Sequence, residues 1–172
     1  MGGTIAVARC KLRSRKMSNT TPDLAEFKVA LCDGVNTALR YLNSRTPHRF
    51  TGVYRYDGET LRNMALFDRF EPEKQRGIDI PMADAYCANV GRNREPLEFA
   101  DAKGDGRFNY LPGSPVVCYS GVLISSPQGI PYGTLCHYDI QRCETRTSDI
   151  PLLKVAAPLI YEALESQQQQ PA

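Results

Sequence analysis

The chain has 172 residues, of which 42% are hydrophobic and 23% charged, and this size and composition predict one globular domain whose core is stable without cross-links. Twenty-one lysines and arginines against 19 aspartates and glutamates give a formal net charge of +2, so the charge offers no reason to expect a nucleic-acid partner. No apolar run approaches the ~20 residues that cross a bilayer, and the first residues lack the apolar core of a secretory signal. We therefore predict a cytoplasmic protein without a membrane partner.

The six cysteines, at positions 10, 32, 87, 118, 136 and 143, are irregularly spaced. Reduced thiols are the expectation for a chain of this size. The cysteines include no local pair of the kind that holds structural zinc, and the two histidines, His48 and His137, lie far apart in the sequence. The sequence therefore predicts no metal site.

Three regions follow from the composition along the chain. Residues 1–20 are basic and polar, and we expect a disordered tail. A second methionine follows residues 1–16, so that segment is either part of this tail or the product of an upstream start of translation. Residues 21–166 carry the periodic apolar patterns of a folded domain, and residues 167–172 form a polar C-terminal tail. Within the domain, apolar residues at steps of three and four predict one helix over residues 20–45.

The elements that follow are mostly strands. Two extended segments flank Asp57-Gly58, a dipeptide typical of hairpin turns. A short strand over 77–82, a short helix over 83–95 and a brief extended piece lead into a loop rich in Gly, Asp and Pro. Two apolar strands then surround a turn at Ser126–Gly129, and a last helix is expected to be interrupted or kinked at Pro158. This order predicts an α+β fold, one antiparallel sheet with helices packed on it.

The run from residue 86 to residue 139 resembles the GAF domains of bacterial signalling proteins, of the type found before histidine-kinase and diguanylate-cyclase modules. The resemblance implies a PAS-like fold, with a six-stranded antiparallel sheet, terminal helices packed on one face and a small ligand cup on the other. It is carried by Cys87, Pro96-Leu97, Asp101, Asp105, Arg107-Phe108, Tyr119, Gly121, Gly129, the segment Gly133-Thr134-Leu135-Cys136 and Asp139.

The function that this resemblance implies is that of a non-enzymatic sensory domain, which binds a small molecule or a signalling partner. A histidine kinase or a diguanylate cyclase would then supply the output, and the terminal helices would pair two copies into a homodimer. The sequence identifies neither the ligand nor a cofactor. The candidate ligand-binding residues are Tyr54, Asp101, Arg107, Phe108, Tyr119 and Cys136.

Two alternatives accompany the sensory interpretation. Free methionine-(R)-sulfoxide reductases share the fold, and their chemistry needs an attacking and a resolving thiol. Cys87 falls where that family carries one cysteine, and Cys118 is the candidate second thiol. The loop in which the family places its attacking cysteine contains none here. The other alternative is a ligand-free dimerisation module.

Two local questions concern the strands and the loop before them. If the second hairpin turned near Pro127, Cys118 and Cys136 would oppose each other, either as a redox pair or as two small side chains that fill the sheet. The loop Gly104–Arg107 could offer its backbone amides to an anion, but its Asp residues favour a turn that they close themselves. Strand alternation places Cys136 and His137 on opposite faces, which argues against a joint Cys-His site.

Overall fold

An antiparallel sheet of six strands forms the centre of the structure, in the order β3-β2-β1-β6-β5-β4. The computed structural model describes residues 22–107, 110–144 and 149–169. The strands are β1 (Phe50–Asp57), β2 (Thr60–Asp68), β3 (Ile80–Pro81), β4 (Leu97–Phe99), β5 (Cys118–Ser125) and β6 (Pro131–Asp139). The helices are α1 (Pro22–Cys32), α2 (Val35–Asn43), α3 (Cys87–Asn93) and α4 (Ile150–Gln168), with a 3-10 turn η1 (Met82–Asp84). The predicted α+β architecture is confirmed.

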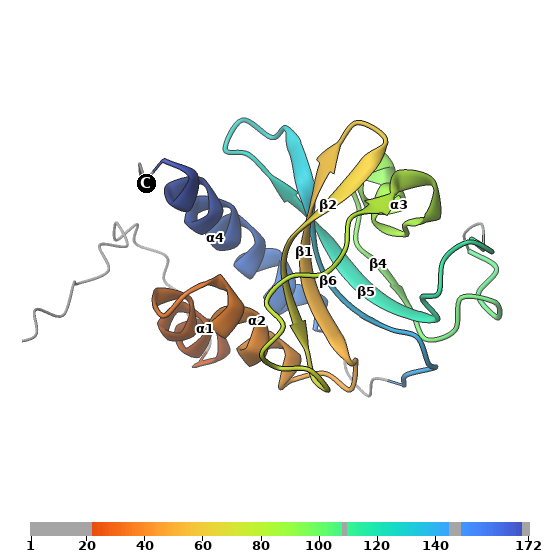
Figure 1. The fold of residues 1–172 in the computed structure, drawn as a ribbon, viewed down its shortest axis with the longest axis horizontal. Helices are drawn as coiled ribbons and strands as arrows, with labels where there is room; N and C mark the ends of the chain where they lie inside the picture. The colour runs from red at the N-terminus through yellow and green to blue at the C-terminus, as the bar shows by residue number, and fades with distance from the viewer. Residues whose placement is uncertain (1–21, 108–109, 145–148, 170–172) are drawn as a thin grey trace, which may run out of the picture.

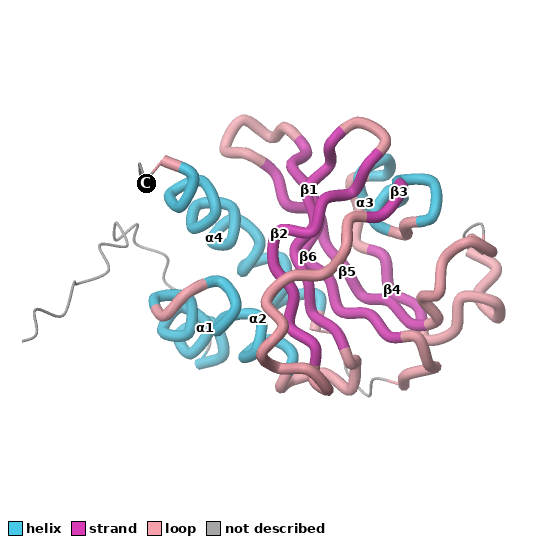
Figure 2. The backbone as a smooth tube through the Cα atoms, in the orientation of Figure 1, coloured by secondary structure: helices cyan, strands magenta, loops and turns pink. Residues whose placement is uncertain are grey.

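The two faces of the sheet are covered differently (Figure 1). Helices α1, α2 and α4 pack on one face, whereas α3, η1 and the long loops lie over the other, as the colouring by secondary structure also shows (Figure 2). The helix-covered face holds an apolar core that includes Phe27, Leu39, Leu135 and Leu153. Each such side chain stabilises the fold by ~1.5–3 kcal/mol when fully buried. The other face carries a second, smaller apolar cluster that includes Tyr86, Phe99 and Tyr119.

The helix predicted over residues 20–45 is in fact two helices, so that prediction is wrong. The chain turns at Gly34, whose φ of 121° lies in a region that favours glycine. The Gly34 amide donates to the Leu31 carbonyl at 3.0 Å, which ends α1. The turn directs α2 onto β1 and β2, while α1 packs against α2 and α4. The apolar spacing continued across the break because both helices bury one side against the same core.

The last helix, α4, runs from Ile150 to Gln168 as one element, so the predicted interruption at Pro158 does not occur. Pro158 lies on the exposed side of the helix. Its missing amide and its ring therefore face away from the core, and the buried stripe of α4 continues past it. The last helical residues extend into the predicted polar tail.

The β5–β6 hairpin has a different register from the predicted one. Ser125 pairs with Pro131 after an irregularity at Ile124/Ser125, so Cys118 opposes Asp139 and Cys136 opposes Gly121. The loop between the strands is longer than a turn centred on Pro127 would be, which shifts the pairing by three. The predicted opposition of Cys118 and Cys136 is therefore wrong.

Several expectations concern segments outside the described residues: the N-terminal tail 1–20, Phe108, and residues 170–172 of the C-terminal tail. Among the helices that the structure describes, none is long and apolar enough to cross a membrane.

Candidate functional site

A cavity of about 340 Å³ lies between the sheet and the segments that cover its second face. Strands β1, β5 and β6 form its floor, and the segment from η1 to the start of α3 and the loop 113–116 form its cover. Seven of the residues that line it carry a hydroxyl or a thiol, namely Tyr54, Tyr86, Cys87, Ser114, Tyr119, Cys136 and Tyr138. The volume falls in the range typical of small-molecule sites.

Three of the six predicted ligand-binding residues meet in this cavity: Tyr54, Tyr119 and Cys136. Each points from a different strand toward the cup face because side chains alternate along a strand. Asp101 and Arg107 are not among the residues that line the cavity, and Phe108 lies outside the described residues. The sequence thus located the floor of the cavity.

Hydrogen bonds connect the hydroxyl groups along the floor of the cavity. Tyr54 and Tyr138 hydrogen-bond through their hydroxyls at 2.6 Å, and the Tyr119 hydroxyl lies 3.3 Å from Cys87 Sγ. Burial raises the pKa of Tyr54, Tyr119 and Tyr138 above the ordinary value. All three phenols therefore stay neutral at physiological pH and can donate hydrogen bonds.

Two buried thiols, Cys87 at the start of α3 and Cys136 in β6, are neighbours in the cavity wall. Interaction with Cys136 lowers the pKa of Cys87, whereas burial raises the pKa of Cys136. Cys87 is therefore the first of the pair to lose its proton. A thiol pair of this kind can both bind a soft ligand and carry out thiol chemistry.

Charged groups at this cavity are confined to Lys74 and Asp84 among its lining residues. The Lys74 side chain is about half exposed and pairs with Glu71 at 3.5 Å. The Asp84 carboxylate packs against Gly113, where an added Cβ would overlap it. A larger residue at position 113 would have to displace the Asp84 carboxylate. Apart from Lys74 and Asp84, the residues that line the cavity are uncharged.

The loop between β4 and β5 is closed by its own aspartates. Asp101 Oδ1 accepts the Lys103 amide at 3.1 Å, and Asp105 Oδ1 accepts the Arg107 amide at 3.0 Å. The Arg107 guanidinium pairs with Asp105 and donates to the Glu98 carbonyl at 2.7 Å. The pKa of Asp105 falls to about 2 because of its hydrogen bonds with Arg107. The prediction of a turn closed by Asp side chains is confirmed.

Cys118, the second thiol of the reductase alternative, faces a different part of the molecule from Cys87. It precedes Tyr119 in β5, and its side chain is on the opposite face of the sheet, 3.1 Å from His48 Nε2. Cys87 contacts Cys136 instead. Strand alternation in the sequence places Cys136 on the same face of β6 as Tyr138. No pattern in the sequence indicates that Cys87, in α3, lies against β6.

No protein-family model matches the chain, and neither does any curated protein. The GAF domain of an Acinetobacter phosphoenolpyruvate-protein phosphotransferase is 14% identical, with a TM-score of 0.63 over 88% of this chain and 97% of that one. A free methionine-R-sulfoxide reductase from Neisseria meningitidis, in complex with its substrate, is 14% identical with a TM-score of 0.63 over 84% and 87%. The type II reductase of Thermoplasma acidophilum is 18% identical with a TM-score of 0.58 over 81% and 95%.

These likenesses concern the fold, since every identity is below one fifth. GAF domains from several sources superpose on most of the chain. The chain has the GAF fold, as its motifs predicted, and this fold is common to GAF domains and to the reductases.

Proposed function

We propose that this GAF-fold chain is a non-enzymatic sensory domain that binds a small molecule in the cavity under the cup. The observation that carries the proposal is the cavity of about 340 Å³ whose interior polar groups are neutral hydroxyls and thiols. A preformed, mostly apolar cavity with a few convergent polar groups is the usual form of a ligand site.

The lining favours an uncharged ligand with an aromatic or apolar body and at least one polar atom. Rings of Tyr86, Tyr119 and Tyr138 supply flat apolar surfaces, and the hydroxyls of Tyr54 and Tyr119 are placed to orient a polar atom. An ion buried there would leave its charge uncompensated, because Lys74 and Asp84 lie at the rim.

The test is native mass spectrometry of the full chain purified from its own host, followed by denaturing extraction of any adduct. We expect a reproducible non-covalent adduct that Tyr119→Phe weakens by ~5- to 10-fold, the value of one hydrogen bond. Tyr161→Phe is the matched control, because Tyr161 lies on α4 and contacts Tyr132 away from the cavity. Absence of any adduct, or equal loss in both variants, would overturn the proposal.

Output from such a domain requires a partner, and we propose a histidine kinase or a diguanylate cyclase together with homodimerisation through the terminal helices. Val29 on α1 and Val155 on α4 are 69% and 41% exposed, and such a pairing would bury them. Light scattering of the wild type and of Val29→Glu tests it: a dimer that becomes a monomer supports the pairing, whereas a wild-type monomer contradicts it. A dimer without any adduct would instead favour a ligand-free dimerisation module.

A second candidate function is supported by the contact between Cys87 and Cys136, namely reduction of a small sulfoxide such as free methionine-(R)-sulfoxide. The Cys87 thiolate would attack the sulfoxide sulfur, and the oxygen would pass to Cys87 as a sulfenic acid while the thioether leaves. The Cys136 thiol would then displace water and form a disulfide, which thioredoxin reduces.

An NADPH-coupled assay with thioredoxin, thioredoxin reductase and free methionine sulfoxide separates the two functions. Turnover that Cys87→Ser and Cys136→Ser each abolish, and that Cys32→Ser on α1 leaves intact, would establish the reductase. Absence of turnover in the wild type rejects it and leaves the binding function to the adduct measurement.

A further inference from the structure

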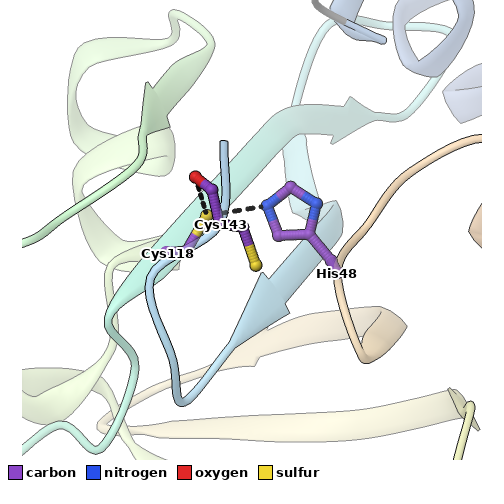
Figure 3. A group of neighbouring side chains, drawn as sticks. All are labelled: His48, Cys118 and Cys143. Carbon is purple, nitrogen blue, oxygen red and sulfur yellow. Dashed lines mark hydrogen bonds between the residues drawn. The ribbon is translucent and has the colours of Figure 1, made fainter. Parts of the chain in front are cut away.

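Three buried side chains from distant parts of the chain converge on the helix-side face of the sheet, away from the cavity under the cup (Figure 3). His48 precedes β1, Cys118 begins β5, and Cys143 follows β6. Their exposed fractions are 1%, 2% and 8%. His48 Nε2 lies 3.1 Å from Cys118 Sγ, and all three ligand atoms lie within 4.8 Å of one another.

These separations suit a shared tetrahedral ion. With Zn–S bonds of ~2.3 Å and Zn–N bonds of ~2.0 Å, ligand atoms in a tetrahedral site stand roughly 3.5–3.8 Å apart. The observed distances bracket that range, so small rotations of the side chains would complete the geometry. Two thiolates and a neutral imidazole also balance the charge of a divalent ion, which a buried site requires.

The imidazole of His48 is held in the orientation that ligation requires. Its Nδ1 hydrogen-bonds Thr46 Oγ1, which leaves Nε2 directed at Cys118. A second hydrogen bond that fixes the far nitrogen is the usual support of a metal-binding histidine. The cluster also has an approach from solvent, because all three residues line a cavity of about 510 Å³.

We propose that His48, Cys118 and Cys143 form a zinc site with three protein ligands and a fourth position that a solvent molecule fills from the adjoining cavity. Nitrogen and thiolate donors in tetrahedral arrangement select zinc over magnesium or calcium. On binding, each thiol releases one proton and the imidazole none. No sequence pattern indicates this set, because its members are 70 and 25 residues apart and include no C-x2-C pair.

The alternative to a zinc site is a disulfide between Cys118 and Cys143. The Cys118 thiol donates to the Cys143 carbonyl at 3.5 Å, and the Cys143 thiol donates to Asp139 at 3.5 Å. The two sulfurs are therefore aimed at different acceptors, and His48 adds a nitrogen donor that a disulfide would leave unused. This arrangement favours metal binding.

The test is titration of the reduced, chelator-treated full chain with zinc chloride against a chromophoric competitor, with cobalt(II) as a spectroscopic substitute. We expect one tight equivalent of zinc and a thiolate-to-cobalt charge-transfer band with tetrahedral d–d bands. Cys143→Ser should weaken zinc binding more than about 100-fold, since the loss of a ligand exceeds the 10- to 100-fold cost of losing a supporting group. Cys32→Ser, on the exposed side of α1, should leave the affinity unchanged.

Thr46→Val provides a finer test of the positioning role of Thr46. It removes the hydrogen bond to His48 Nδ1 at nearly constant volume, and zinc affinity should fall ~10- to 100-fold while the cobalt spectrum stays tetrahedral. If Cys143→Ser fails to fold, the wild-type cobalt spectrum still decides. Absence of a thiolate-to-cobalt band, or zinc binding that Cys143→Ser leaves unchanged, would overturn the proposal; in the latter case the zinc is adventitious.

Discussion

Gly133 lies where β6 passes closest to β1, opposite Arg55 in the pairing of the two strands. An added Cβ would overlap the Tyr54 carbonyl oxygen, a backbone atom that cannot move aside without breaking the sheet. Gly133→Ala should therefore lower the free energy of unfolding by more than about 3 kcal/mol, measured by urea denaturation. Gly106→Ala is the control, because a Cβ there meets nothing within 4 Å. Equal effects of the two substitutions would contradict the packing.

His48 makes the metal-free protein sensitive to acid. Burial and the nearby His137 lower its pKa to about 4, although Asp139 and Asp149 act in the opposite direction and Arg69 adds to the lowering. The unfolded chain, with an ordinary histidine pKa of ~6.5, binds the proton more readily. The free energy of unfolding should therefore fall as the pH drops from about 6.5 to about 4. Below about pH 4, protonation of His48 should cause no further loss.

Chelator-treated protein tests this by urea denaturation at a series of pH values. His48→Gln, which has no proton to gain in this range, should flatten the pH dependence between pH 6.5 and 4. An unchanged slope in that variant would show that other groups carry the effect.

At the residue scale, Tyr54, Tyr119 and Cys136 were candidate ligand-binding residues by their position in the fold that the chain resembles, and all three line the cavity. That they bind a ligand stays a prediction. His48 and Cys143 were not predicted as site residues. They lie just outside strands, where strand alternation does not indicate in which direction a side chain points. Their proximity to Cys118 depends on the pairing of β6 with both β1 and β5, which no local pattern encodes.

At the scale of elements, α4 carries a proline where a helix ordinarily has an amide. Pro158 removes one backbone hydrogen bond from α4 while its side chain is exposed. Pro158→Ala should therefore raise the free energy of unfolding by ~1–3 kcal/mol. Pro151 lies in the first turn, where a proline costs nothing, so Pro151→Ala should give no gain. Thermal unfolding of both variants checks the difference, and equal shifts would contradict it.

The elements themselves were predictable from periodicity, and their junctions were not. The apolar stripe of residues 20–45 gave no sign of the turn at Gly34, because α1 and α2 bury residues against one core. The register of β5 and β6 depended on the five-residue loop from Ser126 to Ile130 and on the irregularity beside Ser125. Hydrophobic spacing is insensitive to such local features.

At the scale of the whole molecule, the thiols differ in their access to solvent. Cys87 and Cys136 lie in the interior under the cup, whereas Cys32 is exposed on α1. In the native protein we expect Cys32 to react with a thiol reagent at least about 100-fold faster than Cys87 and Cys136, because those two react only when the fold opens. Peptide mass spectrometry of timed alkylation measures the three rates.

Denaturant provides the control for that labelling, since the three rates should converge in urea. Comparable rates in the native protein would mean that the segments covering the cavity open easily.

The tyrosines of the cavity have an optical consequence. The chain has nine tyrosines and no tryptophan, and Tyr54, Tyr86, Tyr119 and Tyr138 surround the cavity. Its intrinsic fluorescence therefore comes from tyrosine alone, and a large share of the emitters lies within contact of any occupant. Emission intensity can follow occupancy of the cavity without an added dye.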